Sequence, residues 1–239
     1  MKMRKSIVGV FLIAFTLTGC SPLFYTPNTQ NVPLISEKGD NKLSVAGNGN
    51  QVELQGAYGI TDAFAVQANG GWFLPRKEDN GNGGSGNFFE LGAGYYTPVM
   101  DHFIFETYGL IGFGSMKNNF PSTQESNPES RGDISANAFR IGIQPNFGYK
   151  SKHFEVALSS RIVNLMYNNI KGDLIFGGEN QIEYLEENKS NFLIEPAITL
   201  RGGLENIKLQ LQYGYSFNLS NKDFRQDNSL FTLGISYKF

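Results

Sequence analysis

Apolar and polar residues alternate along most of this chain, and the alternation is clearest at its end. Between Asn228 and Phe239 every second residue from Phe231 onward is large and apolar, and the residues between are small or polar. A period of two indicates a β-strand whose two faces meet different surroundings. The length of this stretch suits a tilted strand that crosses a membrane.

The same alternation recurs from residue 42 to the end of the chain. It predicts an all-β fold, a single up-and-down antiparallel transmembrane β-barrel of about ten strands. Eight strands are the alternative if the first hairpin is a feature of the rim. The predicted strands cover residues 42–47, 51–60, 64–73, 87–97, 103–114 and 139–148, a longer pair that begins at 153 and ends at 201, then 207–218 and 228–239.

The connections between the predicted strands are alternately short and long. The long ones span residues 74–87, 115–133, 168–189 and 219–228. In outer-membrane barrels short turns face the periplasm and long loops face outward. With ten strands, both ends of the chain are therefore expected on the periplasmic side.

The beginning of the chain carries the pattern of an export signal. Lys2, Arg4 and Lys5 precede an apolar run at 7–15, which is too short to span a membrane as a helix. The following Leu17-Thr18-Gly19-Cys20 resembles the lipobox of bacterial lipoproteins. That resemblance implies cleavage between Gly19 and Cys20 and attachment of fatty acid, such as palmitate, to Cys20. No disulfide competes for Cys20, because it is the only cysteine.

Residues 20–41 contain three prolines and no periodicity, so they are expected to form an extended tether between the lipid and the barrel. The predicted organisation is therefore a signal peptide at 1–19, a lipidated tether at 20–41 and a barrel at 42–239. Surface lipoproteins of Bacteroidota-type bacteria often carry an acidic cluster after the cysteine, whereas the first acid here is Glu37. This favours an anchor in the periplasmic leaflet. Whether the tether enters the barrel stays open.

The last strand also resembles the closing strand of bacterial outer-membrane barrels, which ends in an aromatic residue. In those families the terminal Phe helps the insertion machinery to recognise the chain, which implies an insertion signal at Phe239 and Tyr237. The stretch 27–39 resembles the start of small barrel lipoproteins of Bacteroidota-type bacteria. The implied partners are outer-membrane lipid and the barrel-insertion machinery.

Composition bears on which face of the strands points inward. Only 18% of the residues are charged, which is little charge for a surface in water. The chain also has 28 Gly, 20 Phe and 11 Tyr, and this excess of aromatic residues suits the aromatic girdles of a membrane barrel. Small polar residues suit a narrow interior, and an unpaired charge there would cost several kcal/mol. The charges expected inside balance as five acids and five bases: Glu53, Glu90, Glu106, Glu155 and Glu195 against Arg140, Arg161, Arg201, Lys208 and Lys238.

Little in the sequence indicates chemistry. The net charge of −2 offers no footprint for nucleic acid. His102 and His153 are expected at the periplasmic rim without a Ser or Asp partner, so neither an enzyme nor a metal site is predicted. Residues 81–86 fit Gly-x-Gly-x-x-Gly, but they precede a strand instead of opening a helix, so they predict a loop, and no cofactor is expected.

The predicted function is a non-enzymatic structural, accessory or partner-binding role, exerted through the outer loops or the tether. The partner would be another envelope protein of unknown identity, and the acidic stretch 173–187 is one candidate surface for it. Two alternatives remain: a periplasmic lipocalin-like carrier of apolar ligands, with the apolar face inside, and a narrow pore.

Overall fold

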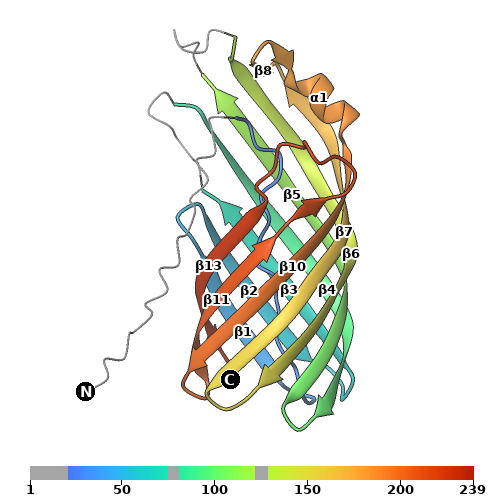
Figure 1. Cartoon of the computed structure of the whole chain (residues 1–239), viewed down its shortest axis with the longest axis vertical. Helices are drawn as coiled ribbons and strands as arrows, with labels where there is room; N and C mark the ends of the chain where they lie inside the picture. The colour runs from blue at the N-terminus through green and yellow to red at the C-terminus, as the bar shows by residue number, and fades with distance from the viewer. Residues whose placement is uncertain (1–20, 75–80, 122–128) are drawn as a thin grey trace, which may run out of the picture.

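The structure is a computed structural model that describes residues 21–74, 81–121 and 129–239. Its main body is a closed antiparallel β-barrel with neighbouring strands in chain order (Figure 1). No helix of the described part is long and apolar enough to cross a membrane. The barrel strands are β1 (Asn41–Gly47), β2 (Gln51–Gly59), β3 (Phe64–Phe73), β4 (Gly83–Met100), β5 (Phe103–Phe120), β6 (Gly132–Lys150), β7 (Phe154–Gly172), β10 (Ser190–Gly203), β11 (Ile207–Tyr215), β12 (Phe217–Asn218) and β13 (Ser229–Tyr237).

The ring closes where β13 pairs with β1, with Val45 opposite Ile235. The short β12 continues β11 beyond Ser216, and both pair with β10, so the wall has ten strands. The predicted ten-stranded up-and-down barrel is confirmed. The eight-stranded alternative is wrong, because β1 and β2 form full ladders with their neighbours and complete the ring.

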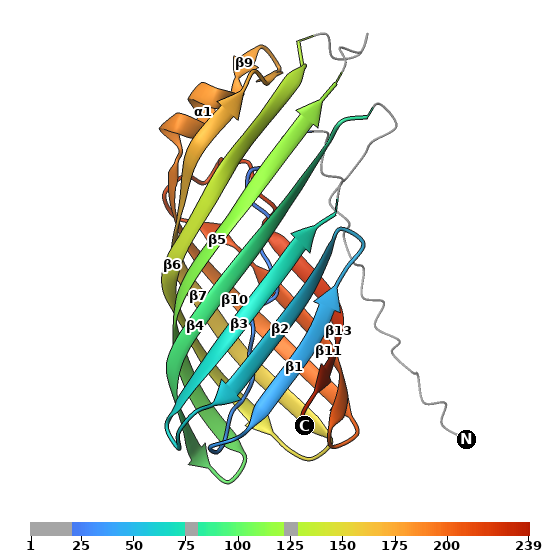
Figure 2. The ribbon, with the colours of Figure 1, turned by 180° about the vertical axis from the view of Figure 1, so that it is seen from behind.

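The wall is much taller on one side than on the other (Figure 2). Strands β4 to β7 have 18 or 19 residues each, whereas β1, β2, β3, β11 and β13 have 7 to 10. The long strands project at the end where the long connections lie. This end is called the long-loop end below, and the opposite end, with the tight turns, is called the short-turn end.

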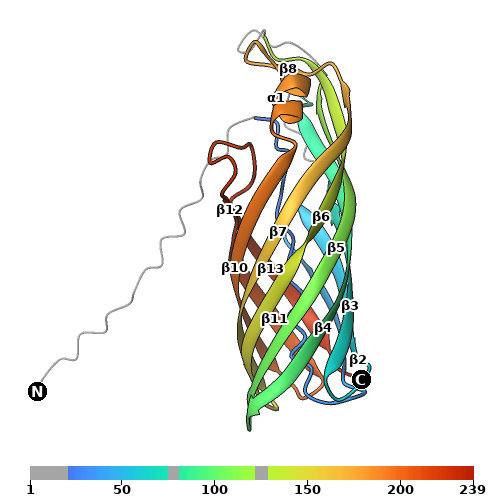
Figure 3. The ribbon, with the colours of Figure 1, turned by 90° about the vertical axis from the view of Figure 1, so that its right-hand side faces the viewer.

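The long-loop end also carries a small hairpin and a helix (Figure 3). They are β8 (Ile175–Phe176), β9 (Glu179–Asn180) and α1 (Gln181–Glu187), and the side chain of Asn180 accepts a hydrogen bond from the first turn of the helix. The sequence predicted only a long hairpin here. Leu174 and Leu185 are fully buried in an aromatic and aliphatic cluster, so the apolar part of the acidic stretch is core and not an open partner surface.

The loop expected at 81–86 is partly wrong. Gly83 to Gly86 belong to β4 and pair with β5, where Gly84 lies opposite Asn118. A Cβ added to Gly84 would lie 2.7 Å from Oδ1 of Asn118, and one added to Gly86 would lie 2.6 Å from the carbonyl oxygen of Ser115. The glycines therefore permit the close approach of the two strands. A glycine-rich stretch has no alternation of apolar and polar side chains, so the sequence pattern did not reveal this part of the strand.

The outward face of the barrel is apolar and the inward face is polar. Leu209 is 69% exposed and Leu233 is 59% exposed, whereas the adjacent Gln210 and Thr232 are buried in the lumen. A lipocalin-like carrier needs the opposite arrangement, with its apolar side chains around an internal ligand. That alternative is therefore wrong for this fold, and the outer band has the character of a lipid-facing surface.

Replacing Leu233 by Arg tests this assignment. Leu233 lies in the middle of β13 on the outer face, where a cation in lipid is expected to lower the free energy of unfolding by about 2–4 kcal/mol. Urea unfolding in lipid vesicles measures this change. The matched control is Leu219→Arg, at an exposed leucine in the connection after β12, and it should leave stability unchanged. Equal effects of the two substitutions would contradict a lipid-facing Leu233.

Candidate functional site: a lumen filled by the N-terminal segment

The lumen of the barrel is occupied by the chain's own N-terminal segment, residues 21–40. The segment lies beside the inner wall, and every residue from 27 to 35 is buried. The backbone N–H of Phe24 donates to Arg225 at the long-loop end, and Tyr25 forms an isolated parallel bridge with Gln226. At the other end Asp40 leads directly into β1. The segment therefore passes through the barrel from one end to the other.

This course corrects one expectation from the sequence. Both ends of the mature chain were expected at the short-turn end, but only Phe239 lies there (Figure 3). Ser21, the first described residue, lies at the long-loop end. The even number of strands correctly places the start of β1, but the segment before it runs back through the lumen.

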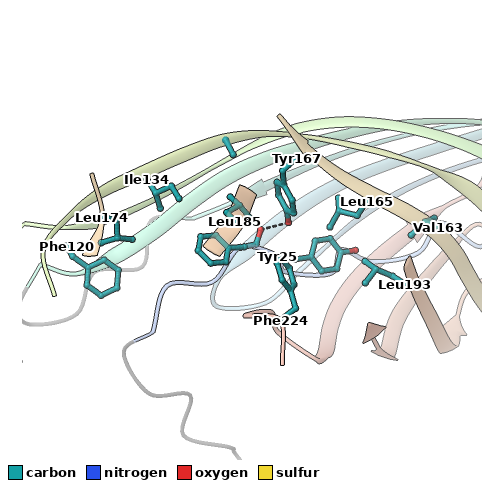
Figure 4. Close-up of a cluster of buried hydrophobic side chains, with 12 residues drawn as sticks. Tyr25, Phe120, Ile134, Val163, Leu165, Tyr167, Leu174, Leu185, Leu193 and Phe224 are labelled. Atoms are coloured by element: carbon teal, nitrogen blue, oxygen red, sulfur yellow. Dashed lines mark hydrogen bonds between the residues drawn. The ribbon is translucent and has the colours of Figure 1, made fainter. Parts of the chain in front are cut away.

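At the long-loop end the segment is held by aromatic packing (Figure 4). The ring of Phe24 lies 5.6 Å from Tyr184 and 6.1 Å from Phe224, measured between centroids. Tyr167 donates a 2.8 Å hydrogen bond to the carbonyl oxygen of Phe24, and Asn118 donates one of the same length to that of Leu23. The hydrophobic cluster of the projecting strands and α1 thus includes the start of the segment.

In the middle of the lumen, wall side chains take the place of a neighbouring strand. Gln212 accepts from the backbone N–H of Gln30 at 2.6 Å and donates to its carbonyl oxygen at 2.9 Å. Gln144 donates to the carbonyl oxygen of Asn31 at 2.7 Å, while the Asn31 side chain donates to Asn69 at 2.8 Å. Buried backbone groups need such partners, and here side chains of the wall provide them.

Most of the predicted interior charges form ion pairs with one another on the inner face of the wall. Arg140 donates to Glu90 at 2.6 Å and Arg161 donates to Glu195 at 2.6 Å, all four side chains being almost fully buried. Glu155 is shared by three cations. They are Lys42 at 2.8 Å, Arg201 at 2.9 Å and Lys208 at 3.0 Å.

The segment enters this network through polar side chains. Tyr25 donates a 2.7 Å hydrogen bond to Glu195 and accepts one from Arg140. Asn28 accepts from Arg140 with its side chain and from Arg161 with its carbonyl oxygen. Two of the wall's ion pairs are thereby completed by the segment, since a guanidinium has more donors than one carboxylate can satisfy.

Glu53 and Glu106 differ from the other interior acids, because neither has an ion-pair partner in the described part of the chain. Glu53 instead accepts hydrogen bonds from the backbone N–H of Thr29 at 2.9 Å and from its hydroxyl at 2.8 Å. Glu106 accepts from the backbone N–H of Ile35 at 2.7 Å. A buried carboxylate without hydrogen-bond partners is strongly unfavourable. Because the segment donates hydrogen bonds to these two carboxylates, the polar groups of the wall and of the segment are complementary.

The predicted set of interior charges needs one correction, although its balance of five acids and five bases is kept. Lys238 does not lie in the lumen: its side chain is 37% exposed at the short-turn end, where it forms a 2.6 Å ion pair with Asp40. Lys42 is the interior cation that sequence reasoning missed. Its inward position follows from the alternation of β1, in which Lys42 and Ser44 share one face.

Asp40 closes the short-turn end as the centre of a small ionic clasp. Its carboxylate accepts from Lys150 at 3.0 Å and from the backbone N–H and hydroxyl of Ser36 at 2.9 and 2.7 Å, besides pairing with Lys238. Burial raises the pKa of the Asp40 carboxyl, but the hydrogen bond from Lys238 and the charge of Lys150 outweigh burial and hold it well below its usual range.

The substitution Asp40→Asn is therefore expected to have a pH-dependent effect. A carboxyl whose pKa is lowered by folding stabilises the protein above its unfolded pKa of about 3.9, and this contribution is lost as the pH falls through the lower folded pKa. The variant should be about 1–2 kcal/mol less stable at pH 7, and the difference should shrink below pH ~4. Urea unfolding between pH 3 and pH 8 measures it; a difference that grows on acidification would contradict the clasp.

The remaining predicted residues lie at the short-turn end or outside the described part. The ring of Phe239 stacks on Tyr237 at 5.7 Å, and its backbone N–H donates to Asn41. His153 lies in a turn against the carbonyl oxygen of Gly203. Gly19 and Cys20 fall outside the described residues. Within the described ranges no three His, Cys, Asp or Glu side chains are placed to hold a metal ion.

No protein-family model matches the sequence, and no curated protein is significantly similar to it. Solved structures of similar arrangement include the KdgM porin (10% identity, TM-score 0.38), the NanC porin (12%, 0.38) and LpxR from Salmonella typhimurium (10%, 0.34). Each comparison covers 84% of this chain and 99% of the other. Likeness at such low identity concerns the fold alone, so the function is argued from the residues.

Proposed function

We propose that this protein is a non-enzymatic outer-membrane β-barrel lipoprotein whose lumen is closed by its own N-terminal segment. The observation that carries the proposal is the match between the segment and the wall. Glu53 and Glu106 accept backbone N–H groups of the segment where other interior acids have cations. A segment with specific partners along its whole length is a resident part of the barrel.

The proposed role is structural or accessory, with the long-loop end as the contact surface for another envelope protein. The lipid on Cys20 would provide a second attachment to the membrane besides the strands. Phe239 and Tyr237 form the exposed aromatic end of the chain that the insertion machinery would recognise. The outer face of the wall carries an apolar band that would contact lipid, as a membrane-spanning barrel requires.

The substitution Cys20→Ser tests the barrel and the lipid separately. If the barrel spans the membrane, the variant should stay in the membrane fraction and be extracted only with detergent. The variant protein should also migrate more slowly on gels after heating. Incorporation of an alkyne-labelled fatty acid should be lost in the same variant. Soluble monomer would contradict the barrel, whereas label that persists in Cys20→Ser would contradict lipidation at this residue.

A second candidate function, a narrow pore, has one observation in its favour. Several polar atoms of the wall have no hydrogen-bond partner among the described residues even with the segment in place, and they point to water beside it. Both side-chain amide atoms of Gln67 belong to this group, as do Oε1 of Gln51, Gln55 and Gln144. Single-channel recording on the intact protein distinguishes the two functions, because the closed barrel should show no steps above background.

A further inference from the structure

We infer that the mature N-terminus emerges at the long-loop end of the barrel and places the lipid of Cys20 in the membrane leaflet on that side. The inference rests on the lipidation proposed above. It opposes the sequence-based expectation of an anchor in the periplasmic leaflet, because long loops of outer-membrane barrels face outward. The protein would then be a surface lipoprotein threaded through its own barrel.

The proposed lipid would be attached very close to the described part of the segment. After signal cleavage before Cys20, a single residue separates the lipid from Ser21, and consecutive Cα atoms are about 3.8 Å apart. The hydrocarbon core of a bilayer is about 30 Å thick. Ser21 and Leu23 lie at the long-loop end, where Asn118 holds the carbonyl oxygen of Leu23. A lipid attached next to Ser21 therefore cannot reach the opposite leaflet while the segment stays in the lumen.

The segment emerges from the lumen close to the ends of the short strands. Ser21 lines a hollow of about 140 Å³ together with Asn50, in the turn between β1 and β2, and Leu74, which follows β3. These are the short strands, so their ends lie near the membrane surface while β4 to β7 project further. The side chains of Trp72 and Leu74 are 44% and 43% exposed there. Trp is the residue typical of the interface between a membrane and water.

The segment is retained in the lumen at both of its ends. The β1–β13 ladder closes the wall, the aromatic packing of Phe24 blocks one end and the clasp of Asp40 blocks the other. A lipidated end cannot be drawn through this filled lumen after the wall has closed. The barrel must therefore close around the segment, and the lipid must cross the membrane during that assembly.

Labelling of single cysteines on intact cells tests the side. Cys20 is the only native cysteine and its thiol is consumed by the lipid, so the wild-type protein should not react with a membrane-impermeant maleimide. Ser21→Cys reports the N-terminus, Glu187→Cys at the end of α1 reports the long-loop end, and Asn206→Cys in the β10–β11 turn reports the short-turn end. All three positions are exposed.

We expect Ser21→Cys to react on intact cells together with Glu187→Cys, and Asn206→Cys to react only after the envelope is permeabilised. Reaction of Ser21→Cys only together with Asn206→Cys would overturn the inference. As a second measurement, a protease site inserted between Ser21 and Pro22 should be cut from outside the cell, releasing the barrel from its fatty-acid label. Labelling of wild-type Cys20 would contradict the proposed lipidation but not the side at which the N-terminus emerges, because Ser21→Cys measures that side independently.

Discussion

Deletion of residues 21–36 is expected to convert a non-conducting barrel into a pore. The wall should survive the deletion, since the β1–β13 ladder closes it, and the isolated bridge of the segment joins Gln226 in the connection before β13 instead of a strand of the wall. An extended chain occupies a cross-section of roughly 5 by 10 Å, given the spacings between strands and between sheets. Its removal should leave a water-filled path lined by Glu53, Glu106 and the glutamines around them. Planar-bilayer recording measures the conductance.

The control for this deletion is the missing segment itself. A synthetic peptide of residues 21–36, added on the long-loop side, should block the pore of the deletion variant, and a peptide of the same composition in scrambled order should not. Heat-modifiable migration on gels shows that the variant is folded. A folded deletion variant that is as silent as the intact protein would contradict the view that the segment closes the lumen.

The substitution Glu155→Gln is expected to be the most destabilising conservative change in the wall. Glu155 binds Lys42, Arg201 and Lys208, and all four side chains are nearly inaccessible to water. Removal of the carboxylate charge leaves three cations without a counter-ion, and breaking one buried ion pair alone costs about 3–5 kcal/mol. Urea unfolding in lipid vesicles should show a loss of at least this size.

The matched control is Glu205→Gln, in the turn between β10 and β11. Glu205 also pairs with a lysine, Lys152, at 2.9 Å, but both side chains are more than 60% exposed. Exposed pairs contribute little, so this substitution should leave the free energy of unfolding unchanged. A small effect of Glu155→Gln, equal to that of the control, would mean that the interior cations reach water or another partner.

The strands themselves were largely predictable, because a half-buried strand shows its two faces as alternation in the sequence. β11 keeps that alternation over its full length and β13 keeps it from Phe231 onward, whereas Gly83 to Gly86 contain no apolar residue to mark a face and were assigned to a loop. Helix α1 was missed for a different reason. Its seven residues are fewer than the roughly 11 over which a helical period can be recognised in a sequence. The helix is held by Asn180 and by burial of Leu185.

The course of the N-terminal segment was harder to predict. Its prolines and lack of periodicity correctly indicated a chain without strand pairing, but its position depends on residues far along the sequence, such as Gln212 for Gln30. The charge count hid the signal. Five acids match five bases whether Lys238 or Lys42 is counted, so the total did not show that Glu155 pairs with three cations while Glu53 and Glu106 have no ion-pair partner among the described residues.

A cysteine pair across the lumen tests the central claim most directly. The Thr29 hydroxyl of the segment lies 3.2 Å from that of Thr232 on β13. In a Cys20→Ser background, Thr29→Cys combined with Thr232→Cys should form a disulfide on oxidation, detected by mass spectrometry of the linked peptides. Thr29→Cys combined with Leu233→Cys, one residue further on the lipid-facing side, should not. A folded protein in which positions 29 and 232 fail to link would contradict the account.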